Sequence, residues 1–219
     1  MIVAAGLTKS FGSVRALDGF DLVVERGERV VMLGPNGAGK STAISILLGL
    51  RRPDRGTVMV LGGRPGDLAV RRRVGCAPQQ TAFPETLRVR EIVDFVRAHH
   101  PRARPSRELL ETFLLAHVAT RQVGGLSGGE RRRLGCALAF AGDPELVVLD
   151  EPSAGLDPQA RVSLWETLRA HAGTILMTTH SFEEADALAT RVVVVNRGRT
   201  AETGARGPFL GDAYLALTS

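Results

Sequence analysis

Short hydrophobic runs separated by turn residues fill the first third of the chain, and this pattern predicts β-strands. Arg29–Leu33 is almost continuously hydrophobic, as expected for a strand that is covered on both faces. The segment Arg26-Gly27-Glu28 before it predicts a turn. The other strands predicted in this part of the chain are Ile2–Leu7, Phe20–Glu25, Thr57–Leu61 and Val74–Ala77.

The pattern changes to helical periodicity between Leu87 and Ala141, where hydrophobic residues recur at helical spacing. Within the last part of this stretch, small and hydrophobic side chains such as Leu134 and Ala137 share one helix face. The helices predicted here are Val89–His99, Arg107–His117 and Gly128–Ala141.

Buried-strand patterns return after residue 145, with a helical segment between the first two strands. This alternation indicates one α/β core, into which the helical stretch is inserted as a segment of about 50 residues. The strands predicted here are Leu146–Leu149, Thr174–Thr179 and Val192–Asn196, and the helices are Gln159–His171 and Asp212–Leu217.

The composition describes a basic protein with a substantial core: the 219 residues are 44% hydrophobic and carry a net charge of +5. A basic surface can bind nucleic acid, but the arginines are scattered and no aromatic residues alternate with them as in a single-strand-binding groove. We therefore interpret the arginine runs as solvated surface and expect no nucleic-acid partner. Of 28 basic residues only Lys9 and Lys40 are lysines, so Lys40 stands out as the compact ammonium that a phosphate-binding loop needs.

No hydrophobic run approaches the roughly 20 residues that a membrane-spanning helix requires. The N-terminal stretch Met1–Lys9 also lacks the basic start and long hydrophobic segment of a signal peptide. We expect a soluble, cytoplasmic protein that acts on a membrane only through another chain.

A glycine-rich loop that ends in lysine and serine follows the strand Arg29–Leu33 and opens a predicted helix, Lys40–Leu50. Its glycines allow backbone N–H groups to surround a phosphate, and the helix N-terminus adds a favourable dipole. We expect Lys40 to bridge the β- and γ-phosphates of ATP and the Ser41 hydroxyl to bind Mg²⁺. The residues expected to contact ATP here are Gly34, Pro35, Asn36, Gly37, Ala38, Gly39, Lys40, Ser41 and Thr42.

An acidic pair, Asp150-Glu151, ends the predicted strand Leu146–Leu149, which should place both carboxylates at the sheet edge beside the phosphate loop. Asp150 suits Mg²⁺ coordination, directly or through water. Glu151 suits the polarisation of the attacking water, because a general base must reach a water in line with the γ-phosphate. Together with the phosphate loop, the pair indicates nucleotide hydrolysis.

The chain resembles the nucleotide-binding subunits of ATP-binding cassette (ABC) transporters over nearly its whole length. Leu126-Ser-Gly-Gly-Glu130 is similar to the family signature Leu-Ser-Gly-Gly-Gln and opens a predicted helix. The resemblance implies that Ser127, Gly128 and Gly129 contact the γ-phosphate of a nucleotide held by a second subunit. Glu130 departs from the family glutamine, and a carboxylate there repels phosphate unless it points away.

Further residues match functional positions of the family. Gln79 after Pro78 resembles the glutamine loop, and would contact Mg²⁺ and the water and sense the membrane partner. Ser153-Ala-Gly-Leu-Asp157 resembles the loop that crosses the dimer interface, with Asp157 near the nucleotide. His180 matches the switch histidine at the γ-phosphate, with a structural histidine as the alternative. Phe11 matches the aromatic residue that stacks on adenine, with a core phenylalanine as the alternative.

The resemblance implies an α/β fold: a P-loop NTPase core with a mostly parallel sheet, an N-terminal antiparallel β-subdomain and a helical insertion. We expect one ABC ATPase domain over residues 1–219, with the core and β-subdomain at about 1–80 and 143–219 and the helical subdomain at about 81–142. The implied activity is Mg²⁺-dependent ATP hydrolysis, with ATP and Mg²⁺ as cofactors. The implied partners are a second copy or a related ATPase subunit, and an integral membrane permease at the inner face of the cell membrane.

Other uses of this ATPase remain as alternatives. A soluble ABC-type ATPase acting on DNA carries a long coiled coil between phosphate loop and signature, but here only about 90 residues without heptad repeats intervene. Ribosome-acting relatives carry two cassettes in one chain. A kinase or GTPase is disfavoured by the signature and His180.

The direction of transport is predicted from resemblance alone. The signature followed by Arg131–Arg133, and the run Ser153 to Pro158, resemble bacterial exporter subunits. We expect no C-terminal regulatory domain of the sugar-importer kind after Thr200. Export is therefore the expectation and an importer subunit the alternative, while the cargo depends on the membrane chain.

Overall fold

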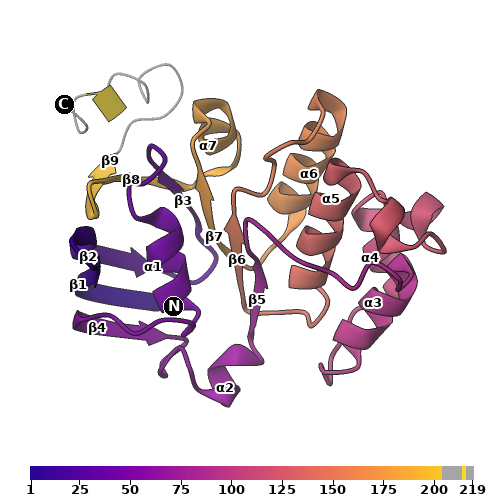
Figure 1. The fold of residues 1–219 in the computed structure, drawn as a ribbon, viewed down its shortest axis with the longest axis horizontal. Coiled ribbons are helices and arrows are strands. Elements are labelled where there is room, and N and C mark those ends of the chain that lie inside the picture. The colour runs from indigo at the N-terminus through magenta and orange to yellow at the C-terminus, as the bar shows by residue number, and fades with distance from the viewer. Residues whose placement is uncertain (204–213, 216–219) are drawn as a thin grey trace. The chain divides into compact units, whose positions relative to one another are not determined.

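The computed structural model describes residues 1–203 together with 214 and 215. The chain forms two compact units (Figure 1). The first comprises Met1–Arg71 and Thr174–Ser219, and the second comprises Arg72–Gly173. The subdomain boundaries expected from the sequence stay predictions.

The N-terminal part of the first unit is a three-stranded antiparallel sheet with one covered and one exposed face (Figure 1). Its strands, in the order β2-β1-β4, are β1 (Ile2–Phe11), β2 (Val14–Val24) and β4 (Arg55–Val60). Ile2 and Ala4 of β1 are buried, whereas Val3 between them pairs with Val23 and Met59 in an exposed row. The alternation follows from the two-residue repeat of a strand.

The second sheet of this unit is mostly parallel, in the order β7-β3-β8-β9. The strands β7 (Thr174–Thr179), β3 (Arg29–Leu33) and β8 (Arg191–Asn196) run parallel, and β9 (Arg199–Thr203) is antiparallel to β8. Every residue of β7 and four of the five in β3 are buried, which explains their continuous hydrophobic pattern. The helices of the unit are α1 (Lys40–Leu47), α2 (Leu68–Arg71) and α7 (Phe182–Leu188).

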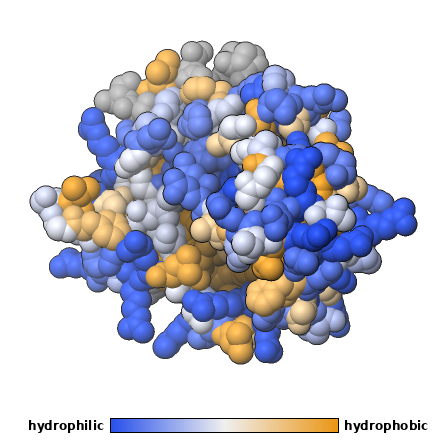
Figure 2. All heavy atoms as spheres, turned by 45° about the vertical axis from the view of Figure 1, so that its right-hand side comes forward, coloured by the Kyte–Doolittle hydropathy of each residue, from blue (hydrophilic) through white to orange (hydrophobic). Residues whose placement is uncertain are grey.

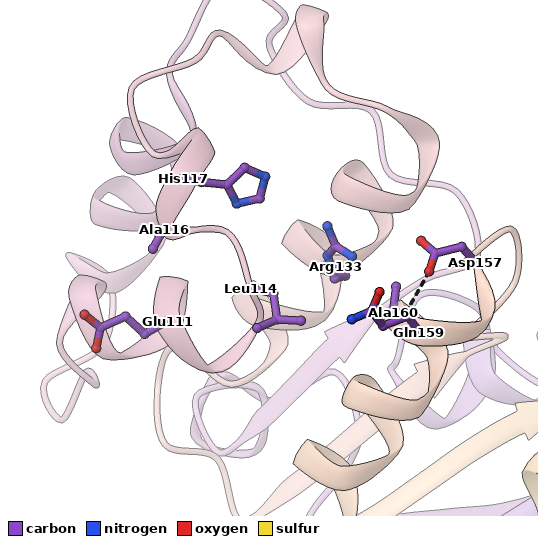
Figure 3. Close-up of a pocket in the computed structure, with 8 residues that line it drawn as sticks. All are labelled: Glu111, Leu114, Ala116, His117, Arg133, Asp157, Gln159 and Ala160. Carbon is purple, nitrogen blue, oxygen red and sulfur yellow. Dashed lines mark hydrogen bonds between the residues drawn. The ribbon is translucent and has the colours of Figure 1, made fainter.

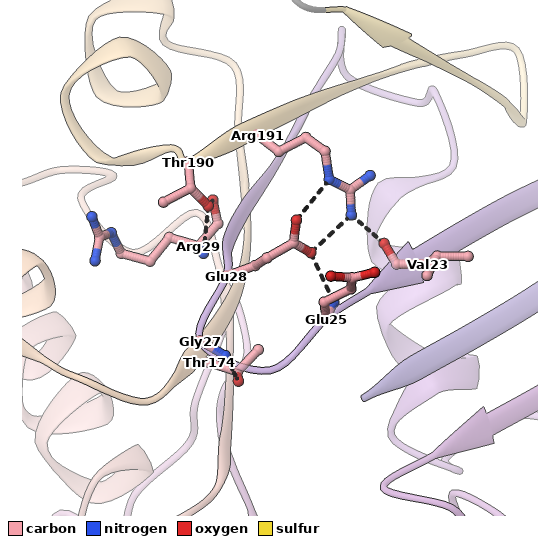
Figure 4. Close-up of polar contacts among 8 residues, drawn as sticks. All are labelled: Val23, Glu25, Gly27, Glu28, Arg29, Thr174, Thr190 and Arg191. Carbon is pink, nitrogen blue, oxygen red and sulfur yellow. Dashed lines mark hydrogen bonds and ion pairs between the residues drawn. The ribbon is translucent and has the colours of Figure 1, made fainter.

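A polar cluster fastens the turn before β3 to the neighbouring strands (Figure 4). The Glu28 carboxylate pairs with Arg191 at 3.1 Å, and the same guanidinium donates to the Val23 carbonyl. Thr190 Oγ1 accepts a hydrogen bond of 2.8 Å from Arg29 N, and Thr174 Oγ1 accepts one of 2.8 Å from Gly27 N. These side chains provide hydrogen-bond partners for backbone groups that would otherwise have none where the chain leaves the antiparallel sheet.

The second unit contains a pair of parallel strands and most of the helices. The strands are β5 (Val74–Ala77) and β6 (Leu146–Asp150), paired from Val74↔Leu146 to Ala77↔Leu149. Gly75 lies against the helix α5, because a Cβ built there would lie 1.7 Å from the Ala139 carbonyl oxygen. The helices are α3 (Val89–Arg97), α4 (Ser106–Thr112), α5 (Gly128–Ala139) and α6 (Pro158–Ala170), with 3₁₀ turns at Ala116–Val118 and Val123–Gly125.

One predicted helix is wrong at its C-terminal end. Arg107–His117 was expected to be continuous, but α4 ends at Thr112. Leu114 takes a left-handed conformation (φ 54°), and Leu115 N donates to the Leu110 carbonyl at 2.7 Å. This is the Schellman arrangement, in which Leu115 is buried together with Leu110 of the last helical turn, while Leu114 is exposed. The helices α2 and α7 and the strand β9 were not predicted, and the predicted helix Asp212–Leu217 lies outside the described residues except for Tyr214 and Leu215.

The visible surface is mostly hydrophilic, with hydrophobic residues in small groups among charged ones (Figure 2). Within the described part of the chain, no helix combines the length and the hydrophobicity needed to cross a membrane.

Candidate nucleotide-binding site

The phosphate loop connects β3 to α1 in the first unit, and each of its three glycines has a conformation or surroundings that disfavour a larger residue. Gly37 and Gly39 have φ of 80° and 108°. A Cβ on Gly39 would lie 2.5 Å from the Ala16 carbonyl oxygen, and one on Gly34 would lie 2.2 Å from that of Val195. The close approach of neighbouring backbone therefore requires glycine at Gly34 and Gly39. That the loop surrounds a phosphate stays a prediction.

Lys40 is the first residue of α1 and only 6% exposed. Its Nζ donates hydrogen bonds to the carbonyls of Gly34 (2.6 Å) and Pro35 (3.0 Å), so the ammonium lies over the loop. Ser41 beside it is exposed and Thr42 is half-buried. A helix N-terminus, a buried ammonium and an exposed hydroxyl thus come together at one loop, which is the arrangement that phosphate recognition requires.

His180 lies at the same sheet edge as the phosphate loop. The parallel strands β3 and β7 pair with Leu33 opposite Thr179, so Gly34 and His180 are the next residues of adjacent strands. His180 is exposed, unlike the six buried residues of β7 before it. The structure therefore brings two predicted phosphate-contacting groups to one edge of the first unit.

Phe11 ends β1 at the tight turn to β2. Its ring is 41% exposed, so the alternative of a core phenylalanine is wrong. The Arg51 guanidinium carbon lies 5.0 Å from the ring centroid, which is a cation–π distance. Stacking of Phe11 on adenine stays a prediction.

In the second unit, the predicted glutamine loop and acidic pair leave neighbouring strands at the same edge. Ala77 of β5 is opposite Leu149 of β6, so Gln79 and Glu151 follow the paired strands at equivalent positions. Asp150 and Glu151 are 5% and 6% exposed, whereas Gln79 is exposed. Glu151 has φ of 55°, a left-handed conformation that costs a non-glycine residue about 1 kcal/mol or more. Backbone strain of this kind concentrates at functional sites.

The signature segment forms the N-terminal cap of α5. Ser127 Oγ accepts from Glu130 N at 3.1 Å, and the Glu130 carboxylate accepts from Ser127 N at 2.8 Å. Glu130 therefore points back toward the cap, beside Arg121 at 3.3 Å and His117 at 3.4 Å. Partial burial alone would raise the pKa of Glu130, but its hydrogen bonds to Ser127 and the charge of Arg121 outweigh burial and lower it. The side chain is thus held as a carboxylate away from the exposed Gly128.

Asp157 has a structural role that the sequence interpretation did not include. It caps α6 by accepting a hydrogen bond of 2.9 Å from Ala160 N, and Pro158 takes the first helical turn. The residue also borders a cavity of about 480 Å³ that Arg133 and His117 line from the other side (Figure 3). Contact of Asp157 with a nucleotide stays a prediction.

Arg132 is the residue that the sequence interpretation missed. It lies in the Arg131–Arg133 run that we interpreted as solvated surface, but it is partly buried, and its guanidinium donates to the backbone carbonyls of Pro78 in the glutamine loop and Asp150 in the acidic pair. The interpretation is wrong for this arginine, because sequence gives no signal for hydrogen bonds to backbone carbonyls.

The predicted residues therefore form two groups. The first unit contains Phe11, the loop from Gly34 to Thr42, and His180, and the second contains Gln79, Ser127, Gly128, Gly129, Asp150, Glu151 and Asp157. In each group, part of the residues follow the ends of parallel strands, the usual place for ligands in α/β proteins: Gly34 and His180 in the first, and Gln79 and Glu151 in the second. A glycine-rich loop with a buried lysine between strand and helix defines a phosphate-loop nucleotide-binding protein.

Comparison with known proteins makes this class specific. The profile of the ABC transporter family matches residues 17–154, and the chain belongs to this family as an ATP-binding, ATP-hydrolysing subunit. The chain is 44% identical to daunorubicin resistance ATP-binding protein DrrA3 of Streptomyces coeruleorubidus, over 93% of this chain and 67% of that protein. It is 43% identical to Nod factor export ATP-binding protein I of Burkholderia lata, over 90% of this chain and 68% of that protein.

Solved structures agree with the sequence relatives. An ATP-binding subunit of an ABC transporter superposes with a TM-score of 0.87 at 29% identity, covering both chains completely. A dimeric ATP-binding cassette in a post-hydrolysis state, bound to ADP and Pi, superposes with a TM-score of 0.85 at 26% identity, covering 94% of this chain and 100% of that one. The predicted family and the predicted α/β P-loop fold are therefore confirmed.

Proposed function

We propose that this chain uses Mg²⁺-dependent ATP hydrolysis to power export through a separate membrane permease. The observation that carries the proposal is the phosphate loop, in which Lys40 is buried at a helix N-terminus and Gly34 and Gly39 leave no room for a Cβ. Export is supported by the relatives, since both are named as ATP-binding proteins and one is named for Nod factor export.

The residues assigned to Mg²⁺ fit that ion by their chemistry. Ser41 offers a hydroxyl, Gln79 an amide oxygen and Asp150 a carboxylate, and hard oxygen ligands are those that Mg²⁺ prefers. The bound ion would neutralise charge on the phosphates. Lys40 would bind the β- and γ-phosphates, Glu151 would accept a proton from the attacking water, and His180 would contact the γ-phosphate.

Two copies, or this chain and a related subunit, would pair so that Ser127, Gly128 and Gly129 of one serve the nucleotide of the other. The proposal is supported by the dimeric cassette among the similar structures. The permease would hold the pair at the inner face of the membrane and select the cargo.

The proposal is tested by Lys40→Ala and Glu151→Gln in the purified protein. We expect Lys40→Ala to weaken ATP binding and remove hydrolysis, and Glu151→Gln to bind Mg·ATP while losing hydrolysis. Glu111→Gln, which changes an exposed carboxylate on α4, is the matched control and should keep the parental rate. Normal turnover in the Lys40 or the Glu151 variant would refute the assignment.

A further inference from the structure

The Arg132 side chain reaches from α5 to the two loops that follow β5 and β6. Its Nη1 donates to the Pro78 carbonyl at 2.6 Å and to the Gln79 carbonyl at 3.1 Å. Its Nε donates to the Pro152 carbonyl at 3.2 Å, and its Nη2 donates to the Asp150 carbonyl. A guanidinium has five N–H donors in one fixed plane. The Arg132 guanidinium therefore makes all four hydrogen bonds at the same time.

The four carbonyls belong to residues that surround the two proposed catalytic side chains of this unit. Asp150 and Pro152 are the residues on either side of Glu151, and Pro78 precedes Gln79. The pairing of β5 with β6 ends at Ala77↔Leu149, so it does not fix the loops that follow. Beyond that pair, Arg132 joins the glutamine loop to the acidic pair through its hydrogen bonds to Pro78 and Asp150.

Glu151 is the residue that most needs such a fixed backbone. Its left-handed φ of 55° is unfavourable for a side chain with a Cβ, so the surroundings must hold it. Hydrogen bonds to the carbonyls before and after Glu151 restrict rotation about its backbone bonds. Cationic donors make these hydrogen bonds stronger than neutral ones.

We propose that Arg132 is a positioning residue, which holds the backbone of Glu151 and Gln79 in the arrangement that ATP hydrolysis needs. The inference rests on the proposed function, because it takes Glu151 and Gln79 as the groups that act on the attacking water. Arg132 also belongs to α5, five residues after Ser127, so its side chain connects the signature helix to the two loops. We expect ATP binding by Lys40 and its loop to be independent of Arg132, because none of the hydrogen bonds described for Arg132 goes to that loop.

The experiment compares Arg132→Ala and Arg132→Lys with the parental protein and with Arg107→Ala, an exposed arginine of the same unit whose Nε pairs with Glu111 at 2.7 Å. Steady-state ATP hydrolysis gives kcat and KM, fluorescent-nucleotide titration gives affinity, and thermal unfolding reports stability. We expect kcat of Arg132→Ala to fall roughly 10- to 100-fold, since small misplacement of catalytic groups costs up to about 100-fold. Nucleotide affinity should stay within about twofold. The kcat of Arg132→Lys should lie between those of the parental protein and Arg132→Ala, because an ammonium has three donors and lacks the planar fork of a guanidinium.

A second readout separates positioning from general stabilisation. Millimolar methylguanidinium, added to Arg132→Ala, can occupy the space of the lost side chain and should restore part of kcat without raising the unfolding temperature of this variant. It should not change kcat of Arg107→Ala. If Arg132→Ala does not fold, kcat and nucleotide affinity are compared between Arg132→Lys and the parental protein.

The inference is overturned if a folded Arg132 variant keeps the parental kcat, or if its loss of rate comes with an equal loss of nucleotide affinity. It is also overturned if methylguanidinium gives no recovery in Arg132→Ala. Retention of activity in Lys40→Ala refutes the proposed function itself, whereas an active Arg132→Ala beside an inactive Lys40→Ala refutes only the role of Arg132.

Discussion

The Glu130 carboxylate accepts a hydrogen bond of 2.8 Å from Ser127 N, while Ser127 Oγ accepts one of 3.1 Å from Glu130 N. This reciprocal pair is a capping box, which satisfies two backbone donors that the first turn of α5 would leave unpaired. It explains how a carboxylate can replace the family glutamine in the signature: the side chain points toward the cap and toward Arg121.

The first prediction concerns Glu130→Gln and Glu130→Ala. Glutamine keeps the hydrogen bond to Ser127 N, so we expect ATP hydrolysis within about twofold of the parental rate. Alanine removes the hydrogen bond to Ser127 N, while Glu130 N still donates to Ser127 Oγ, and should lower the free energy of unfolding by about 1 kcal/mol. Chemical denaturation and ATPase assays of both variants measure these effects. Equal stability of the two variants would show that the capping box contributes nothing.

The second prediction tests whether one site is built from two subunits. Ser127→Arg should lose hydrolysis and keep ATP binding, because Ser127 is proposed to serve the nucleotide of the partner. When this variant is mixed with Lys40→Ala, half of the randomly formed dimers are mixed, so roughly a quarter of all sites are intact. ATPase activity should reappear up to that fraction. Loss of ATP binding in isolated Ser127→Arg would contradict the shared site.

A third prediction follows from the close packing of β5 on α5. Gly75→Ala places a methyl group where the Ala139 carbonyl oxygen lies only 1.7 Å away, so the helix or the strand must move. Overpacking of this severity should lower the free energy of unfolding by about 3 kcal/mol. Gly66→Ala is the matched control, since a Cβ there meets no heavy atom within 4 Å. Differential scanning calorimetry should show a lower unfolding temperature for Gly75→Ala alone.

The fourth prediction concerns pH and the Glu28–Arg191 pair. Partial burial raises the pKa of Glu28, but the hydrogen bonds from Arg191 and the Glu25 backbone outweigh it and hold the pKa below its ordinary value of 4.5. A carboxyl whose pKa is lowered on folding contributes stability above its unfolded pKa, and this contribution is lost as pH falls through the folded pKa.

Glu28→Gln should therefore be less stable than the parental protein by about 1 kcal/mol at pH 7, and the difference should shrink below pH 4.5. Urea unfolding at several pH values measures it. Glu25→Gln, an exposed carboxyl in the same turn, should change stability little at any pH. A Glu28→Gln difference that persists unchanged at low pH would mean that charge is not its source.

The sequence predicts the buried strands best, because their pattern has one physical cause. Arg29–Leu33 and Thr174–Thr179, whose residues are almost all buried, have the predicted bounds in the structure. A strand that is covered on both faces is almost continuously hydrophobic, so the first and last residues of the hydrophobic run indicate where the strand begins and ends. The phosphate loop is predictable for a similar reason, since only glycine fits its backbone at Gly34 and Gly39.

Other features depend on contacts that are distant in the sequence. The pattern of α4 continues beyond Thr112, but the burial of Leu115 against the preceding turn ends the helix. The edge strand Arg199–Thr203 carries mostly polar residues and gives no hydrophobic signal. Arg132 binds carbonyls of segments 18 to 54 positions away along the chain, and carbonyls are present at every residue. No residue type could have identified its role.

The scarcity of lysine gives the phosphate loop a built-in chemical reporter. The chain has two side-chain amines, one on Lys9, which pairs with Asp54 at 2.7 Å on the antiparallel sheet, and one on Lys40 in the loop. An amine-reactive reagent therefore produces at most two side-chain adducts, which intact-mass and peptide mass spectrometry can separate. ATP bound at the loop would shield Lys40 and leave Lys9 reactive, so the ratio of the two adducts would measure nucleotide occupancy in the native chain, with Lys9 as the internal standard.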